Sequence, residues 1–149
     1  MLVYAGTGFT PMMKVINEYC NNAENVKDQF TLTLIAFNKS AKDIIWREQI
    51  DALKNTLEQS KNMSFTVNHI LSQEHETDNK QIYRKGRISL ELLKEMLSPN
   101  LQKLDTSAAL KDEARLCCIC GPIPFNREAK RLFESEFEYK CDELHLFEG

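Results

Sequence analysis

The spacing of apolar residues along the chain switches repeatedly between the pattern of a strand and that of a helix. This pattern predicts strands and helices in alternation. Short apolar or β-branched runs predict strands over residues 2–5, 30–38, 64–71, 115–120 and 143–147. Apolar positions spaced three and four apart predict helices over residues 11–22, 43–60, 89–98 and 124–137. Polar stretches predict surface loops over residues 73–84 and 99–114.

This order predicts an α/β fold of the Rossmann-like, doubly wound kind, with a five-stranded parallel sheet and helices on both faces. Residues 115–120 are almost continuously apolar, as expected for a strand buried on both faces. Ligands of such sheets bind at the carboxyl ends of the strands, near the point where the strand order reverses. Turns over residues 6–11 and 120–122 occupy two such ends, and they predict the site.

The first of these turns has the residue types that a phosphate site needs. Gly6 and Gly8 let the backbone turn tightly and approach a ligand closely. We expect Thr10 to cap the next helix and Pro11 to be its first residue. The free amides of a helix N-terminus suit a phosphate, so the turn predicts a dinucleotide site. An ordinary strand–turn–helix connection is the alternative, because a lone glycine pair is weak evidence.

Composition and charge narrow the class of protein. The 149 residues, 42% hydrophobic and 28% charged, fit one globular domain. A net charge of −3 makes nucleic acid or an anionic membrane an unfavourable main partner. No apolar run approaches the roughly 20 residues of a membrane span. Five cysteines are too few for a disulfide framework and no leader precedes the first strand, so we expect an intracellular protein, in the cytoplasm or at the cytoplasmic face of the endoplasmic reticulum.

The cysteines of the buried strand do not predict a metal site. Alternate side chains of a strand point to opposite faces, so Cys118 and Cys120 share a face and Cys117 does not. Cys117 and Cys120 have the Cys-x-x-Cys spacing, but on a strand their side chains point to opposite faces, and no nearby histidine completes a tetrahedral zinc site.

Several motifs occur together in a fixed order. They are Ala5-Gly6-Thr7-Gly8-Phe9-Thr10-Pro11-Met12, Phe37-Asn38-Lys39-Ser40-Ala41-Lys42-Asp43-Ile44-Ile45, Gly86-Arg87-Ile88, Cys120-Gly121-Pro122 and the late aromatic Phe147. Jointly they resemble the pyridine-nucleotide-binding domain of the ferredoxin–NADP reductase superfamily, and within it the NADH–cytochrome b5 reductase family. The resemblance covers nearly the whole chain and extends to members that carry a cytochrome b5 domain and a reductase on one chain.

The resemblance implies that residues 1–149 are the NAD(P)-binding domain of a flavin-dependent reductase whose FAD-binding barrel is absent from this chain. Such a domain binds NADH or NADPH and positions it for hydride transfer to FAD held by a separate domain. Electrons then pass to a haem protein such as cytochrome b5. The chain alone is then an oxidoreductase fragment that binds nucleotide without turnover. The alternatives are a nucleotide-binding regulatory module without redox activity and a mononucleotide binder of flavodoxin type.

The same resemblance assigns roles to both turns. Gly6, Thr7, Gly8 and Thr10, with their neighbours Phe9 and Pro11, frame the pyrophosphate and the nicotinamide ribose. Cys120, followed by Gly121 and Pro122, lies beside the nicotinamide ring and orients it for hydride transfer without acting as a nucleophile. The alternative for Cys120 is an ordinary buried cysteine of a strand.

Three further positions concern the adenosine half and the flavin. Asn38 and Lys39 lie near the adenosine in relatives, or else form a polar loop capped by Asp43. Relatives that prefer NADH carry an acidic residue near Ser72, where a carboxylate bonds the ribose 2′-OH and repels a 2′-phosphate. Serine does neither, so we expect NADH or NADPH. Phe147 matches an aromatic that relatives stack near the flavin, or it is a core residue of the last strand.

The basic residues that follow Ser72 have two interpretations. Arg84, Lys85 and Arg87 lie a short way along the chain from the serine. They either favour a 2′-phosphate or belong to a solvated loop.

Overall fold

The computed structural model describes residues 1–21, 30–58, 62–73, 83–104 and 115–147. Within these residues six parallel strands form one sheet in the order β4-β3-β2-β1-β5-β6. The strands are β1 (Leu2–Ala5), β2 (Phe30–Asn38), β3 (Met63–Leu71), β4 (Tyr83–Lys85), β5 (Cys117–Cys120) and β6 (Leu144–Phe147). The predicted α/β class and parallel sheet are confirmed, with one strand more than the five predicted.

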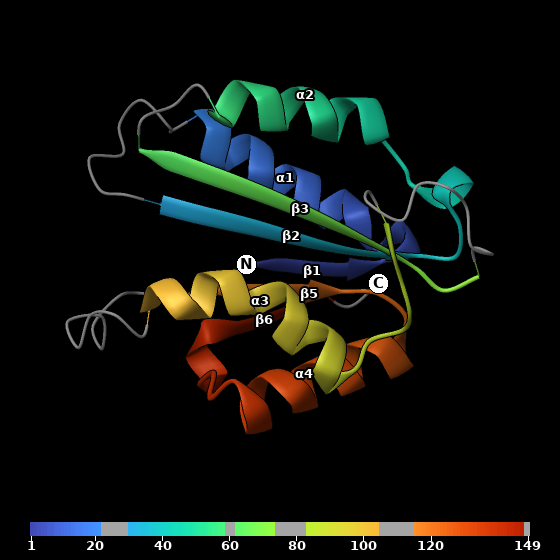
Figure 1. Cartoon of the computed structure of the whole chain (residues 1–149), viewed down its shortest axis with the longest axis vertical. Helices are drawn as coiled ribbons and strands as arrows, with labels where there is room; N and C mark the ends of the chain where they lie inside the picture. The colour runs from blue at the N-terminus through green and yellow to red at the C-terminus, as the bar shows by residue number, and fades with distance from the viewer. Residues whose placement is uncertain (22–29, 59–61, 74–82, 105–114, 148–149) are drawn as a thin grey trace.

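Four helices cover the two faces of this sheet in the described part of the chain. They are α1 (Phe9–Asn21), α2 (Arg47–Glu58), α3 (Leu90–Leu104) and α4 (Ile123–Glu136). In Figure 1, α1 and α2 lie on one side of the sheet, and α3 and α4 lie on the other. The helices therefore lie on both faces, as the alternating pattern predicts.

The core divides into two clusters because neighbouring residues of a strand face opposite ways. Tyr4, Leu34 and Cys118 pack with the buried faces of α1 and α2. Val3 and Ile119 pack with α3 and α4. Strands β1, β2 and β5 are buried on both faces, which accounts for their nearly continuous apolar sequences. Each fully buried large apolar side chain contributes about 1.5–3 kcal/mol to folding.

The extra strand, β4, begins inside a predicted loop. Residues 73–84 were expected to be irregular, yet Tyr83–Lys85 pairs in parallel with the end of β3, with Tyr83 opposite His69. Three residues are too few to show a periodicity, and the backbone groups at the edge of β3 decide the pairing. Residues 74–82 of the predicted loop lie outside the described residues.

Three helix boundaries differ from the prediction. Helix α1 begins at Phe9, so Thr10 lies inside its first turn and is not the N-cap. Helix α2 begins at Arg47, because Ser40 and Asp43 close a separate 3-10 turn and do not open the helix. In that turn the Asp43 carboxylate accepts from the Ser40 N–H at 2.9 Å and from the Ser40 hydroxyl at 2.7 Å. The prediction that Asp43 caps the next helix is therefore wrong, because Asp43 ends a separate turn whose N-cap is Ser40.

Helix α3 continues to Leu104 through Pro99, where the sequence predicts its end. Proline removes one backbone hydrogen bond from a helix interior. The helix is nevertheless held against the sheet by Leu93, Met96 and Leu97, which are buried in the second cluster. The rest of the predicted connection, residues 105–114, lies outside the described residues.

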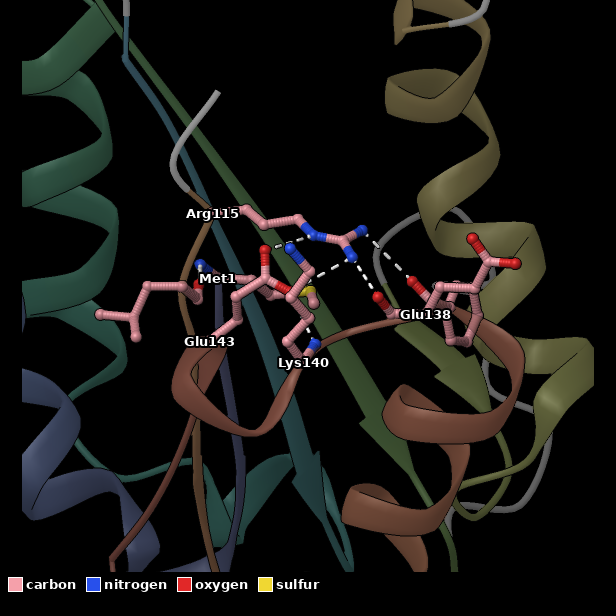
Figure 2. Close-up of polar contacts among 7 residues, drawn as sticks. Met1, Arg115, Glu138, Lys140 and Glu143 are labelled. Atoms are coloured by element: carbon pink, nitrogen blue, oxygen red, sulfur yellow. Dashed lines mark hydrogen bonds and ion pairs between the residues drawn. The ribbon is translucent and has the colours of Figure 1, made fainter. Parts of the chain in front are cut away.

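A polar network joins the amino ends of β5 and β6 (Figure 2). Arg115, just before β5, donates from Nε to the Glu143 carboxylate at 2.9 Å and from a terminal nitrogen to the Phe137 carbonyl at 3.2 Å. A second terminal nitrogen donates to the Glu138 carbonyl, and the guanidinium lies 4.3 Å from the centre of the Tyr139 ring. These contacts lie at the amino ends of the strands, which is the end of the sheet opposite the predicted site.

Candidate nucleotide-binding site

The strand order reverses between β1 and β5. From β1 the chain builds outward through β2, β3 and β4, and then crosses by α3 to the other side of β1, where β5 and β6 lie. Tyr4 of β1 is opposite Cys120 of β5, so the two strands end next to each other. The turns over residues 6–8 and 120–122 therefore meet at the place where parallel α/β sheets bind ligands.

The two turns are in direct backbone contact. A Cβ atom built on Gly8 would lie 2.2 Å from the Cys120 carbonyl oxygen and 2.6 Å from its carbon. A Cβ atom on Gly121 would lie 3.1 Å from the Ala5 methyl and 2.7 Å from the Phe125 ring. The missing side chains at Gly8 and Gly121 thus allow the turns to pack together.

At Gly6 the backbone conformation, and not a close contact, favours glycine. Its φ is +55°, a left-handed conformation that other residues rarely adopt. Among the described residues, no atom would lie within 4 Å of a Cβ atom there. Of the two glycines in the first turn, Gly6 faces open space and Gly8 faces the second turn. Only Gly6 therefore has room beside it for a ligand.

The other predicted residues of the first turn divide by exposure. Thr7 and Thr10 are exposed at the start of α1, and Pro11 is half-buried. Phe9 is 2% exposed, and its ring centre lies 5.1 Å from that of Tyr4. Thr7 and Thr10 are accessible to a ligand, whereas Phe9 anchors the turn in the core.

Cys120 and Phe147 lie side by side across the sheet. They are paired in the register of β5 and β6, and both belong to the cluster under α1. Burial raises the pKa of the Cys120 thiol, whose residue is 6% exposed, so it stays protonated near neutral pH. Cys117 lies on the opposite face and packs under α3 and α4, as the strand alternation predicts.

The carboxyl ends of β2, β3 and β4 lie at the same end of the sheet as the two turns. The Ser72 N–H donates to the Asn38 carbonyl at 3.0 Å, and the Gln73 N–H donates to the Lys39 carbonyl at 2.8 Å. The Gly86 N–H donates to the carbonyl of the last residue of β3 at 3.1 Å. Asn38, Ser72 and Gly86 thus stand in line with the first turn, and the exposed side chain of Lys39 flanks them.

Tyr4 and Asn38 have unpaired polar atoms near the carboxyl ends of β1 and β2. The Tyr4 hydroxyl and both polar atoms of the Asn38 side chain are buried and make no hydrogen bond in the described structure. Burial raises the pKa of Tyr4 to about 12. Sequence reasoning counted Tyr4 only as an apolar strand residue. A hydroxyl at the carboxyl end of a buried strand was the signal that could have marked it.

The basic residues after Ser72 are not equivalent. Arg84 is ion-paired with Glu95 of α3, while Lys85 and Arg87 are exposed on either side of Gly86. These two cations line a hollow of about 390 Å³ together with Gly86, Ser89, Glu91, Leu92 and Glu95. Another hollow, of about 450 Å³, lies at the amino half of β3 and does not touch the turns.

Asn126 of α4 supports the end of the last strand and was missed by sequence reasoning. Its buried side-chain amide donates to the Phe147 carbonyl at 3.3 Å. Asn126 lies three and seven residues before the buried Ala129 and Phe133, so a polar residue on an apolar helix stripe was its signal.

Neither metal ligands nor a membrane helix is found in the described ranges. No group of three or more His, Cys, Asp or Glu side chains is placed to hold a metal ion there. Among the same residues, no helix has the length and apolarity that crossing a bilayer requires.

Comparison with known proteins shows the family of this chain. Residues 2–131 match the family model of the oxidoreductase NAD-binding domain. The chain is 35% identical to human cytochrome b5 reductase 4 over 147 residues, which are 98% of the chain and 24% of that relative. It is 24% identical to mouse NADH-cytochrome b5 reductase 2 over 146 residues, which are 98% of the chain and 45% of that protein. The chain thus spans about a quarter of the length of the first relative.

Solved structures that resemble this chain also include cytochrome b5 reductase domains. The CS-b5R domains of human Ncb5or, in an NAD+ form, superpose with a TM-score of 0.72 at 32% identity, covering 99% of this chain and 36% of that one. The cytochrome b5 reductase domain of Ulva prolifera nitrate reductase gives 0.69 at 18% identity, covering 98% and 47%, and supports the fold. The chain therefore belongs to the family of oxidoreductase NAD-binding domains, and within that family it groups with the cytochrome b5 reductases.

Proposed function

We propose that this chain binds NADH or NADPH across the two contacting turns and presents the nicotinamide ring to FAD held by a separate domain. The whole chain is then one nucleotide-binding domain of a longer reductase. Electrons leave that reductase for a haem protein such as cytochrome b5. The observation that carries the proposal is the backbone contact between Gly8 and the Cys120 carbonyl at the reversal of strand order.

That contact supports one position for the nucleotide. Because the turns touch each other, a ligand lies over both of them and not between them. The diphosphate sits over Gly6 and Thr7, where the backbone is open and the amides before α1 can donate hydrogen bonds. The nicotinamide half extends over residues 120–122. The adenosine half extends the other way, toward Asn38 and Ser72.

Cys120 acts by position in this scheme. Its thiol stays neutral because burial raises its pKa, so it packs beside the ring without attacking it. Phe147, paired with Cys120, closes the same side of the site. A flavin bound by the neighbouring domain supplies the hydride acceptor. The contribution of this chain is to hold the ring at a fixed distance and angle from that acceptor.

Both nicotinamide cofactors fit the adenosine side. Ser72 has no charge to repel a 2′-phosphate, and the exposed Lys85 and Arg87 stand next to it along the edge. Glu91 and Glu95 line the same hollow and moderate this positive charge. We therefore propose that the chain accepts both NADH and NADPH.

Titration of the chain with NADH and with NADPH, followed by amide NMR, tests the proposal. The amides of Gly6, Gly8 and Cys120 should shift in a saturable way. The amides of Arg115 and Glu143, at the opposite edge of the sheet, serve as an internal control and should stay in place. Shifts confined to that opposite edge, or no saturable shift, would refute nucleotide binding here.

The redox part of the proposal needs the complete reductase. Rapid mixing with NADH should reduce its flavin, followed by reduction of added cytochrome b5. Nucleotide binding with no flavin reduction would instead identify a regulatory module.

A further inference from the structure

Trp46 is the single tryptophan of the chain, and it lies in an unusual position. It follows the 3-10 turn of Ala41–Asp43 and immediately precedes α2. Its side chain is 53% exposed, and its φ is +59°. Ile44, two residues earlier, is buried, so the turn sends one apolar side chain into the core and leaves the largest one outside.

Local backbone structure does not account for a tryptophan there. A bulky residue with a left-handed backbone is disfavoured, and asparagine or glycine adopts this conformation far more readily. Trp46 also caps α2, because its carbonyl accepts from the Ile50 N–H at 3.0 Å. Good capping side chains accept hydrogen bonds, whereas an indole only donates. Strained residues of this kind concentrate at functional sites.

The indole stands next to the first turn of the site. Its ring centre lies 6.1 Å from that of Phe9, with the two planes at 76°. Phe9 directly follows Gly8 and is itself packed on Tyr4 of β1. Trp46 therefore extends a row of aromatic rings from the core to the surface at the carboxyl ends of the strands. It lies in the segment that follows β2 after Asn38.

We propose that the indole of Trp46 is the surface on which the adenine ring of the nucleotide stacks. This inference rests on the proposed function, because it takes the diphosphate to lie over Gly6 and the nicotinamide over Cys120. With the strands in the order β2-β1-β5, a dinucleotide placed in that way extends its adenosine toward β2, where Trp46 is exposed. Stacking of a base on an aromatic ring contributes roughly 1–3 kcal/mol, which is about 5- to 150-fold in affinity.

Trp46 also makes the test direct, because all tryptophan fluorescence of the chain comes from this residue. NAD+, ADP-ribose and AMP, which contain adenine, should quench or shift that fluorescence with saturation. Nicotinamide mononucleotide, which lacks adenine, should leave it nearly unchanged even where calorimetry detects its binding.

Variants separate stacking from folding. Trp46→Ala should weaken ADP-ribose binding by about 5- to 150-fold and leave nicotinamide mononucleotide binding unchanged. Trp46→Asn suits a left-handed residue, so it should keep the thermal midpoint of the wild type and still lose the same affinity. Ile45→Ala, which removes a neighbouring side chain that is 40% exposed, is the matched control and should bind as the wild type does.

Two results separate failure of this inference from failure of the proposed function. If ADP-ribose binds Trp46→Ala and Trp46→Asn as tightly as it binds the wild type, adenine does not stack on Trp46, and the nucleotide site itself stands. The exposed indole would then be a candidate contact for a protein partner instead of for adenine. If no nucleotide binds the wild-type chain, both proposals fall.

Discussion

Replacing Gly8 by alanine tests the contact on which the site depends. The new methyl carbon would lie 2.2 Å from the Cys120 carbonyl oxygen, and Cβ contacts shorter than 3.0 Å are essentially never seen. The two turns must therefore move apart by at least about 0.8 Å. Both of the nearest atoms belong to the backbone of a strand end, so no side chain can rotate to relieve the clash.

The expected loss of stability follows from that geometry. Overpacking of a close-packed region costs about 1–3 kcal/mol, and a clash with backbone belongs in the upper part of that range. For a chain of this size each kcal/mol lowers the thermal midpoint by about 2–4 °C, so Gly8→Ala should lower it by roughly 4–12 °C. Urea unfolding should give the same loss through a lower midpoint at an unchanged slope.

Gly6→Ala and Gly6→Asn are the matched controls. Alanine at Gly6 meets no atom of the described part of the chain within 4 Å, but it must adopt a φ of +55°, which costs about 1–2 kcal/mol. Asparagine tolerates that conformation better and should cost less. The order of destabilisation should therefore be Gly8→Ala, then Gly6→Ala, then Gly6→Asn.

The opposite pattern would refute this reasoning. If Gly8 only left room for a diphosphate, Gly8→Ala would unfold as the wild type does and lose nucleotide affinity alone. A thermal midpoint of Gly8→Ala at or above that of Gly6→Ala would mean that the two turns are not packed together.

Three further predictions concern single side chains. In the complete reductase, Cys120→Ala should slow flavin reduction more than it weakens nucleotide binding in stopped-flow and calorimetric measurements, and equal losses would contradict an orienting role. Ser72→Asp should weaken NADPH binding relative to NADH by roughly tenfold, since like charges about 5 Å apart repel by about 1–3 kcal/mol, and an unaltered ratio would place Ser72 away from the 2′ position. The Arg115 hydrogen bond lowers the pKa of Glu143 below its usual 4.5, so the stability it adds is fully present above that value and is lost as the pH falls through the folded pKa. Glu143→Gln should flatten the acid side of the curve of unfolding free energy against pH, and curves of equal slope would exclude this contribution.

Local sequence patterns were sufficient for much of this architecture. The apolar runs of β1, β2 and β5 and the helical stripes between them specify which segments are strands or helices, because burial on one or two faces demands those periods. The turn at Gly6 and the end of β5 at Cys120 were likewise visible as candidate sites. The opposite facing of Cys117 and Cys118 followed from the alternation of a strand alone.

Other features depended on contacts between distant segments. Strand β4 has no periodic pattern of its own and pairs because the edge of β3 offers free backbone groups. Helix α2 starts late because the pair of Ser40 and Asp43 closes its own turn, after which Ile44 is drawn into the core.

By itself the sequence determined the kinds of elements, their order and the residues at the carboxyl ends of the strands, because periodicity and turn chemistry act over a few residues. Only the tertiary structure decided that Gly8 meets the Cys120 carbonyl and that Trp46 packs beside Phe9. The first of these contacts requires the chain to cross through α3 to the far side of β1, and that crossing is set by how whole helices pack on the two faces of the sheet.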